Sequence, residues 1–353
     1  MQDNKTQFLL LILVIMGSVG LIDCNSYNEG WPTPSSTHSI QYMSGVGEIW
    51  SLKNVYTGQD SSPRMVASAG KVFILGNIGN NTEENIVCLD GLNGNVVWRK
   101  TNRGYEEPGY PLVGYPSVLF AAPDGLYVGY GGVPSVKKLA LSTGDILWSQ
   151  SLDGRGLWFL YAQEDSVQVS TDPFIHTVLD KITGEILQST QDWRGGQDIY
   201  ISAPDVTIMH PLQVVRTSTG ELIWRQDLDR ELTLAHIFLD HIILVRTNRT
   251  MGSIYALARA SGAILWKTDG NIISGIAYSP SNAKVYVLTR DGKLLSIDRD
   301  SGNQVTLAVF SSVPFVLNGE QVVGGYEIAF DDTTEMLYVL LGDSRQLYAF
   351  MVE

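Results

Sequence analysis

The sequence predicts an all-β fold, a seven-bladed β-propeller closed by an N-terminal strand. Two observations favour this architecture. A short signature recurs with a period near forty residues: a small polar residue, a glycine and, four positions later, usually a tryptophan. Short β-rich runs separated by turn residues precede each copy, and no stretch of residues 31–353 shows a sustained helical apolar period.

The signature occurs six times. Its glycines follow one another at gaps of 50, 40, 36, 42 and 40 residues; they are Gly94, Gly144, Gly184, Gly220, Gly262 and Gly302. Four copies carry the tryptophan, namely Trp98, Trp148, Trp224 and Trp266. Gln188 and Thr306 stand at the corresponding positions of the other two copies. A period of this length indicates a repeat architecture in which each repeat is one supersecondary unit.

The glycine and the tryptophan each have a physical reason. A tight hairpin turn needs positive φ, which glycine adopts without a Cβ clash, and the preceding polar residue can bond the local backbone. Asp90, Asp180 and Asp298, four residues before their glycines, are expected to bond the same turns. Side chains alternate along a strand, so Ile223 and Trp224 are expected to point opposite ways. The indole then covers the seam between adjacent sheets while its N–H finds a polar partner.

Pairs of strand-like runs can be followed along the chain in order. They are 71–76 with 85–90, 125–130 with 136–141, 166–170 with 175–180, 205–209 with 213–217, 241–246 with 253–258, 283–289 with 293–298, and 335–341 with 346–352. The seventh pair has no turn and tryptophan after it. The run 47–52, "GEIWSL" with Trp50, reads like such a strand but has no strands before it. We expect it to complete the seventh blade and remove the exposed edges; eight blades is the alternative.

Composition restricts the function. The chain has 37 Asp and Glu against 24 Lys and Arg, a net charge of -13, and no basic run, which argues against binding nucleic acid. The two cysteines, Cys24 and Cys88, cannot build a disulfide framework or a cysteine metal site. His236 and His241 would face opposite sides of a strand, which argues against a shared zinc. The acidic pair Asp331 and Asp332 is expected to be solvated loop charge.

The N-terminal residues predict export. Lys5 precedes an uncharged apolar run, 8–22, so residues 1–23 are interpreted as a signal peptide or a membrane anchor. Cys24 ends the segment "LIDC", where a lipidated cysteine could stand; cleavage, lipidation and retention all stay open. Residues 24–45 are predicted to be a flexible tether and 46–353 the propeller. The protein is expected to be extracytoplasmic and to meet the membrane only through its N-terminal segment.

The repeats resemble a known family. "VCLDGLNGNVVW", "LALSTGDILW", "VVRTSTGELIW" and "IYALARASGAILW" look like the pyrroloquinoline-quinone-type (PQQ-like) propeller repeat. The resemblance implies that catalytic members hold the quinone and a Ca²⁺ on the propeller axis, many under a vicinal disulfide. This chain has no adjacent cysteines and no assignable aspartate base, so a non-catalytic member without a cofactor is expected. It is also similar to the non-catalytic propeller lipoproteins of the outer-membrane β-barrel assembly machinery, which have eight blades.

These features predict an exported or membrane-anchored, non-enzymatic scaffold that binds another protein or a cell-envelope ligand. A quinone-dependent dehydrogenase of alcohols or sugars is the main alternative, and a sugar-binding propeller is a third. Binding is expected in loops, because a propeller leaves its strands to packing. The aromatic segments 102–115 and 191–196 supply the candidate partner-binding residues, Tyr105, Tyr110, Trp193 and Arg194.

Overall fold

A computed structural model describes most of the chain from residue 40 onward. The described residues are 40–43, 46–56, 64–78, 85–101, 116–162, 165–172, 175–191, 199–202, 206–209, 212–216, 219, 221–228, 237–238, 242–246, 252–268, 272–310, 316–317, 320–321, 327–341 and 345–352. Within them, no helix has the length and apolarity needed to cross a membrane.

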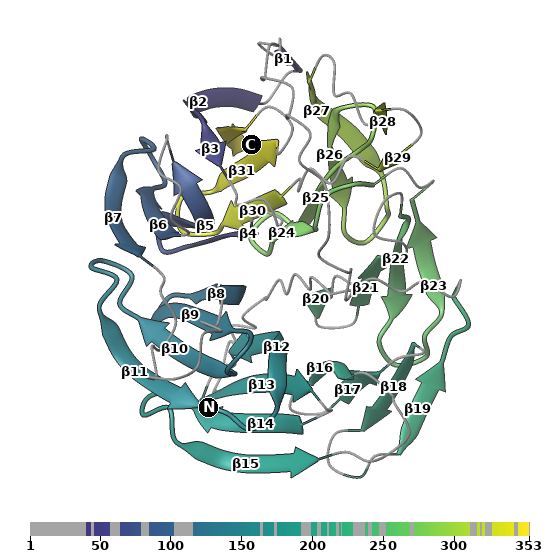
Figure 1. The fold of residues 1–353 in the computed structure, drawn as a ribbon. Coiled ribbons are helices and arrows are strands. Elements are labelled where there is room, and N and C mark those ends of the chain that lie inside the picture. The colour runs from purple at the N-terminus through teal and green to yellow at the C-terminus, as the bar shows by residue number, and fades with distance from the viewer. Residues whose placement is uncertain are drawn as a thin grey trace, which may run out of the picture.

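Seven antiparallel sheets, here called blades 1 to 7, stand around a central axis in chain order, as Figure 1 shows. Blade 1 contains β4 (Arg64–Ser68), β5 (Lys71–Ile78), β6 (Asn85–Asp90) and β7 (Val96–Thr101), with β3 (Val55–Tyr56) paired to β5. Blade 2 contains β8 (Pro116–Ala122), β9 (Gly125–Tyr130), β10 (Ser135–Leu139) and β11 (Ile146–Ser151). Blade 3 contains β12 (Arg155–Ala162), β13 (Ser166–Asp172), β14 (Ile175–Asp180) and β15 (Ile186–Gln191).

The remaining blades follow the same plan. Blade 4 contains β16 (Ile199–Ser202), β17 (Val206–Met209), β18 (Gln213–Arg216) and β19 (Leu222–Arg225), and blade 5 contains β20 (Ile237–Phe238), β21 (Ile242–Arg246), β22 (Ile254–Ala258) and β23 (Ile264–Lys267). Blade 6 contains β24 (Ala277–Ser279), β25 (Lys284–Leu288), β26 (Lys293–Asp298) and β27 (Gln304–Phe310). Blade 7 contains β30 (Glu327–Asp331), β31 (Met336–Leu341), β32 (Gln346–Val352) and β2 (Val46–Lys53). A two-stranded sheet, β28 (Val316–Leu317) with β29 (Glu320–Gln321), lies between blades 6 and 7 in the chain.

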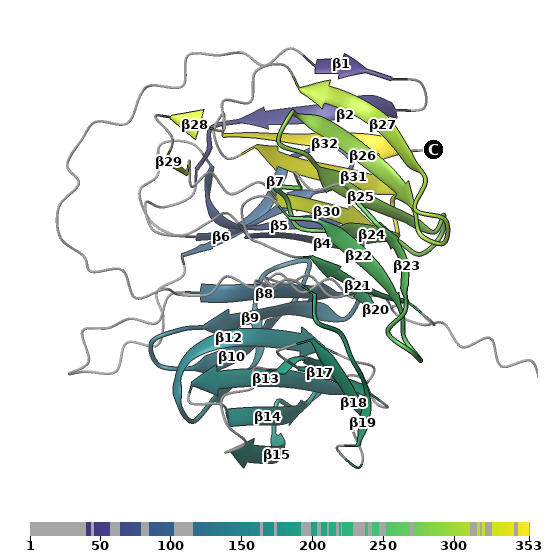
Figure 2. The same ribbon diagram turned by 90° about the vertical axis from the view of Figure 1, so that its right-hand side faces the viewer.

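The N-terminal strand closes the ring, which confirms the predicted seven-bladed architecture. β2 pairs antiparallel with β32 from Val46 opposite Val352 to Lys53 opposite Gln346. The two ends of the propeller therefore share one sheet, and Figure 2 shows β2 lying along β32 from the side. Closure leaves every fourth strand on the outer rim and every first strand at the axis.

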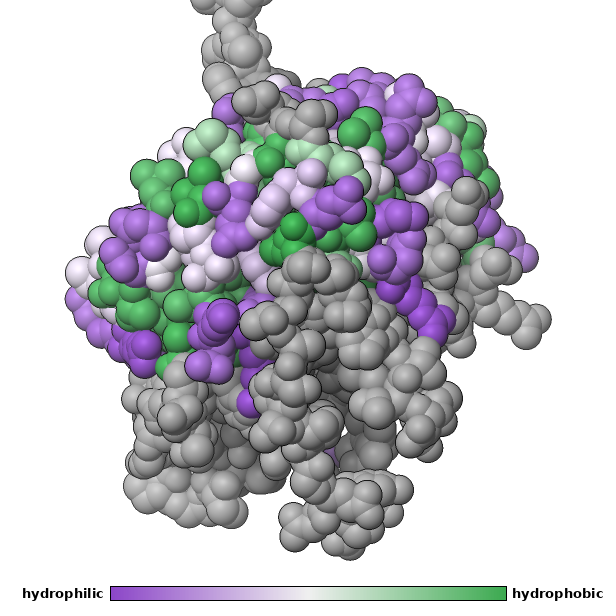
Figure 3. Space-filling model, turned by 90° about the horizontal axis from the view of Figure 1, so that it is seen from above, coloured by the Kyte–Doolittle hydropathy of each residue, from purple (hydrophilic) through white to green (hydrophobic). Residues whose placement is uncertain are grey.

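A short strand lies where the sequence predicts a flexible tether. Ile40–Tyr42 form β1, which pairs antiparallel with β27, the outer strand of blade 6. Ile40 is half-buried against apolar side chains of blades 6 and 7, which is the physical reason for this order. The rim at this side is seen from above in Figure 3, where apolar residues form several separate groups among hydrophilic ones.

Each tryptophan of the repeat joins one blade to the next. Its indole Nε1–H donates to a backbone carbonyl in the turn between the third and fourth strands of the following blade. The bonds are Trp50 to Gly91 (2.8 Å), Trp98 to Leu141 (2.8 Å), Trp148 to Lys181 (3.1 Å), Trp224 to Arg259 (2.6 Å) and Trp266 to Arg299 (2.6 Å). We call these contacts indole staples.

The turn glycines have a second role beside their backbone conformation. Gly184 has φ +78°, and a Cβ built on it would lie 2.7 Å from Cδ2 of Trp148, so the indole lies flat against the glycine. The same arrangement repeats at Gly94, Gly144, Gly262 and Gly302, whereas Gly220 lies outside the described residues. Glycine is therefore needed both for the left-handed backbone and for the space that the neighbouring blade's indole fills.

The aspartates ahead of these turns bond the backbone as expected. Asp180 Oδ1 accepts the N–H of Thr183 at 2.7 Å and that of Ile182 at 2.9 Å. Asp298 Oδ1 accepts the N–H of Ser301 at 2.9 Å, and Asp90 Oδ1 accepts that of Leu92 at 3.1 Å. These carboxylates fix the turns that accept the indole hydrogen bonds of Trp50, Trp148 and Trp266.

The ladder of blade 4 is interrupted beside Ile223 and Trp224. Val214 faces Trp224 and Val215 faces Leu222, so Ile223 is the extra residue of a β-bulge, and both Ile223 and Trp224 pack on one core cluster. The ladder shifts at the matching place in β2, β7, β11, β15 and β23. A bulge bends the outer strand and re-aims the following side chain, which directs the indole toward the next blade.

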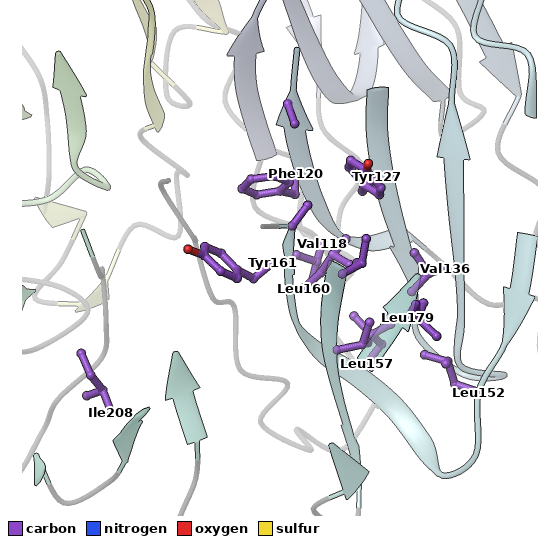
Figure 4. Packing of buried hydrophobic residues seen from close by; sticks show 14 of the residues in the cluster. Val118, Phe120, Tyr127, Val136, Leu152, Leu157, Leu160, Tyr161, Leu179 and Ile208 are labelled. Atoms are coloured by element: carbon purple, nitrogen blue, oxygen red, sulfur yellow. The ribbon is translucent and has the colours of Figure 1, made fainter. Parts of the chain in front are cut away.

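The core lies between the faces of neighbouring blades. In Figure 4, Val118, Phe120 and Tyr127 of blade 2 face Leu157, Leu160 and Tyr161 of blade 3. Separate clusters fill the seams between blades 5 and 6, 6 and 7, 7 and 1, and 1 and 2. The ring is thus a rigid frame whose strands and turns are committed to packing.

Candidate functional site

A small cavity lies at one end of the propeller axis. Its volume is about 180 Å³, and its walls come from the ends of the innermost strands of four blades, β4, β8, β24 and β30. Val66, Phe120, Ala277 and Ala329 make the walls largely apolar, while Asp331 and Asp332 supply carboxylates. The cavity forms where the first strands of blades 1, 2, 6 and 7 end and lead into their second strands, on the same side of the ring as the turns that receive the indole staples.

Asp331 is buried and committed to structure. Its Oδ2 accepts the backbone N–H of Gly70 in blade 1 at 2.7 Å and the hydroxyl of Thr334 at 2.8 Å, while Oδ1 accepts the N–H of Thr333 at 3.2 Å. The carboxylate thus joins blade 7 to blade 1 beside the staple from Trp50. This corrects the expectation that Asp331 is solvated loop charge; the side chain is 2% exposed.

Asp332 is exposed at the mouth of the cavity, as expected for a loop carboxylate. Desolvation by the surrounding protein raises its pKa to about 6, and the neighbouring negative charges of Asp331 and Glu335 add to this effect. Asp331, Asp332 and Glu335 thus bring three acidic side chains into one small region. The mouth of the axial cavity is therefore acidic.

The cavity does not fit the quinone that catalytic relatives of this repeat would hold on the axis. Sites for cofactor-sized ligands measure about 300–1,000 Å³, whereas this cavity has a volume of about 180 Å³. The oxygens of Asp331 already accept three hydrogen bonds, so binding Ca²⁺ there would break the contact between blades 7 and 1. Among the residues that the structure describes, no group of three or more His, Cys, Asp or Glu side chains is placed to hold a metal ion.

The predicted partner-binding residues lie outside the described residues. Tyr105 and Tyr110 belong to the connection from β7 to β8, and Trp193 and Arg194 to that from β15 to β16. Both connections start where an outer strand ends and return to an inner strand. In four-stranded antiparallel blades such connections leave the face opposite the turns that receive the indole staples, so both segments start and end on one face of the ring.

The axial cavity could not be predicted from the sequence, because four blades each contribute a few ordinary residues to it. The usable signal is positional: Ser68 ends the first strand of its blade, and Pro123 and Asp332 directly follow the first strands of theirs. Counting strands within each repeat would have placed them together at the axis.

The comparisons with known proteins agree with this fold. A family model described as "Outer membrane protein assembly factor BamB" matches residues 82–217, 206–312 and 250–334. Together these matches span residues 82–334, more than half of the chain. No curated protein matches the sequence.

Three solved structures show the same architecture at low identity. BamB from Moraxella catarrhalis has 13% identity and a TM-score of 0.51, covering 87% of this chain and 98% of that chain. The computationally designed Ika8 protein has 15% identity and a TM-score of 0.53, covering 86% and 99%. A chain of the Mitotic Checkpoint Complex has 11% identity and a TM-score of 0.58, covering 96% and 99%.

Proposed function

The chain belongs to the PQQ-like β-propeller family whose model is described as outer membrane protein assembly factor BamB, and from this premise we propose that it is a non-enzymatic scaffold that binds another protein outside the cytoplasm. Residues 1–23 deliver it there as a cleaved signal peptide, by lipidation at Cys24, or as a retained membrane anchor. The partner belongs to the assembly of outer-membrane proteins, as the family description indicates for its relatives.

The observation that carries this proposal is that the two faces of the ring differ in their contacts between blades. The turns on one face receive the indole staples and are held by Asp90, Asp180 and Asp298. Connections on the other face carry no staple among the described contacts, and they include the predicted aromatic segments. A rigid frame that carries loops on one face is the arrangement that binding proteins use to present a partner surface.

Photo-crosslinking in the native envelope tests the proposal. A photoreactive amino acid replaces Tyr105 in the connection from β7 to β8 or Trp193 in the connection from β15 to β16. Leu92 and Ile182, which are exposed residues of the turns that receive the staples, serve as controls. We expect the same protein to be crosslinked from position 105 and from position 193. The substitutions Tyr110→Ala and Arg194→Ala should abolish this crosslink. Crosslinks made only from the turn face, or none from either face, would contradict the proposal.

A further inference from the structure

The seam between blades 6 and 7 differs from the stapled seams. In blade 7 the third and fourth strands, β32 and β2, come from opposite ends of the propeller, so no turn joins them and an indole from blade 6 has no turn to land on. The spacing from Gly302 puts Thr306 at the tryptophan position, but the register of β27 places Val305 there instead, opposite Ser296, and Val305 is exposed. This seam has no staple, like the seam between blades 3 and 4 where Gln188 stands in place of the tryptophan, but it has another connection.

β1 provides it. The strand pairs with β27 through Ile40–Phe310, Gln41–Val309 and Tyr42–Ala308, and the N–H of Met43 donates to the carbonyl of Leu307 at 3.0 Å. A few residues later the same segment enters β2 and pairs with β32. One stretch of chain thus runs from the outer edge of blade 6 to the outer edge of blade 7.

Side chains of β1 join the two blades as well. The rings of Tyr42 and Phe350 meet edge-on, with 6.3 Å between their centroids. The Tyr42 hydroxyl donates a hydrogen bond to the carboxylate of Glu48 in β2. Phe350 also meets Phe310 at 6.2 Å, so the rings form a chain across the seam. Ile40 packs on the same apolar cluster, which has members in both blades.

β1 is also weakly held. It has three residues against eight in β2, it is the last strand of its sheet among the described residues, and Gln41 and Tyr42 are exposed. Few backbone bonds and little buried area are the features of segments that open locally at low free energy. The stapled seams have no such element among the described contacts.

We propose that β1 is a detachable clasp for the seam between blades 6 and 7. Its release loosens this seam and uncovers the apolar outer edge of β27, Leu307–Phe310, while the stapled seams stay closed. The uncovered edge accepts an extended strand of a partner protein by antiparallel addition, with an aliphatic and an aromatic residue two positions apart, as in Ile40 and Tyr42. Binding or tension on the residues before β1 acts on this clasp first.

Hydrogen exchange on the full chain tests the clasp. The variant Tyr42→Ala removes the contact with Phe350, and we expect amides of β27 and of Met43 to exchange about tenfold faster, the change expected when one aromatic contact is lost. Peptides from the stapled strands β7 and β23 should exchange at the parental rate. Val133→Ala, an exposed residue in blade 2, is the matched control and should change none of these rates.

A second variant locks the strand. Gln41 and Val309 are directly paired, so Gln41→Cys with Val309→Cys in a Cys24→Ser background places two thiols across β1 and β27. Oxidation should slow exchange in β27 about tenfold below the parental rate, and reduction should restore it. Faster exchange spread evenly over all blades in Tyr42→Ala, or no effect of the disulfide on β27, would overturn the proposal.

Discussion

At the scale of single residues, each staple combines a hydrogen bond with a packing contact that only glycine permits. Trp148 is 8% exposed, its Nε1–H donates to Lys181 of the next blade, and its ring lies on Gly184. Lys138 donates to the same carbonyl at 3.1 Å and pairs with Asp124 at 2.8 Å. The turn of blade 3 is therefore held from blade 2 by an aromatic ring and by a buried ammonium group.

Trp148 and Gly184 should act as one unit. Trp148→Ala removes a buried indole and should lower the free energy of unfolding by about 3–5 kcal/mol. Gly184→Ala should cost more than the ~1 kcal/mol of a left-handed alanine, because its Cβ meets the ring. In the double variant the clash is absent. The losses of the two single variants should therefore add up to more than the loss measured for the double variant, by about 1 kcal/mol or more. Urea unfolding of all four proteins measures this; strict additivity would contradict the contact.

The acidic mouth of the axial cavity should destabilise the protein at neutral pH. The folded pKa of Asp332 is about 6, above its ordinary 3.8, so the unfolded chain holds fewer protons than the folded chain between these values. Stability from this group is present below about pH 4 and is lost as the pH rises through 6. Asp332→Asn should therefore stabilise the protein at pH 8, by at most about 1 kcal/mol because the side chain is exposed, and should change little at pH 4.

Asp145 provides the control of opposite sign. Hydrogen bonds from Lys100 and Thr143 lower the pKa of its carboxyl group, so the charged form is favoured in the folded protein. Asp145→Asn should destabilise at pH 8. Thermal unfolding at pH 4 and pH 8 compares the two variants. If Asp332→Asn is less stable than the parent at pH 8, the charged carboxylate of Asp332 does not destabilise the folded protein.

At the scale of elements, the turn glycines and the strand runs could be predicted because each is local. The period places a Gly94-type turn in every repeat, and the seven pairs of runs correspond to β5 with β6 and their equivalents. The bulge before Trp224 could not be predicted, since "LIW" reads as plain alternation and only the ladder shows the extra residue. β1 was missed because three residues in a polar segment carry no periodic signal. The axial cavity depends on distant repeats meeting, so no single motif reports it.

The outer strand of blade 3 should accept the staple that it lacks. β15 has the bulge at Leu187, and Gln188 faces Val178 as Trp148 faces Lys138 in blade 2. Blade 4 has a turn after β18, where the N–H of Arg216 donates to Glu221. Gln188→Trp should therefore raise the free energy of unfolding by about 0.5–2 kcal/mol.

Val305→Trp is the matched control for this gain. Val305 occupies the ladder position of the tryptophan in blade 6, but blade 7 has no covalent turn between β32 and β2. An indole there should remain exposed and leave stability unchanged or lower. The urea midpoints of Gln188→Trp and Val305→Trp are compared with that of the parent. If both midpoints rise equally, the added apolar area explains the stabilisation and the turn of the next blade does not.

At the scale of the whole molecule, the closed ring couples the ends of the chain. An open array of repeats has stability that sums over neighbours and can unfold from either end. Here β2 gives blade 7 its fourth strand, and Trp50 then staples blade 7 to Gly91 of blade 1. Asp331 adds a bond from blade 7 to Gly70 at the axis. The first and last blades are thus joined by the same kind of staple as the other stapled neighbours and by one further side-chain bond.

Removing the closing strand should turn the ring into an open array. A chain that starts at Val55 lacks β2 and the Trp50 staple, so it should unfold at lower urea concentration and over a broader range than the full chain. A peptide of residues 46–53 should raise the midpoint by mass action, with about 1.4 kcal/mol for each tenfold increase in peptide above its dissociation constant. The same peptide with Trp50→Ala keeps the backbone pairing but loses the staple, and should need a higher concentration for the same shift. If the truncated chain unfolds like the full chain, the N-terminal strand adds nothing to the ring, and the seam between blades 7 and 1 must be held by Asp331 and the core cluster alone.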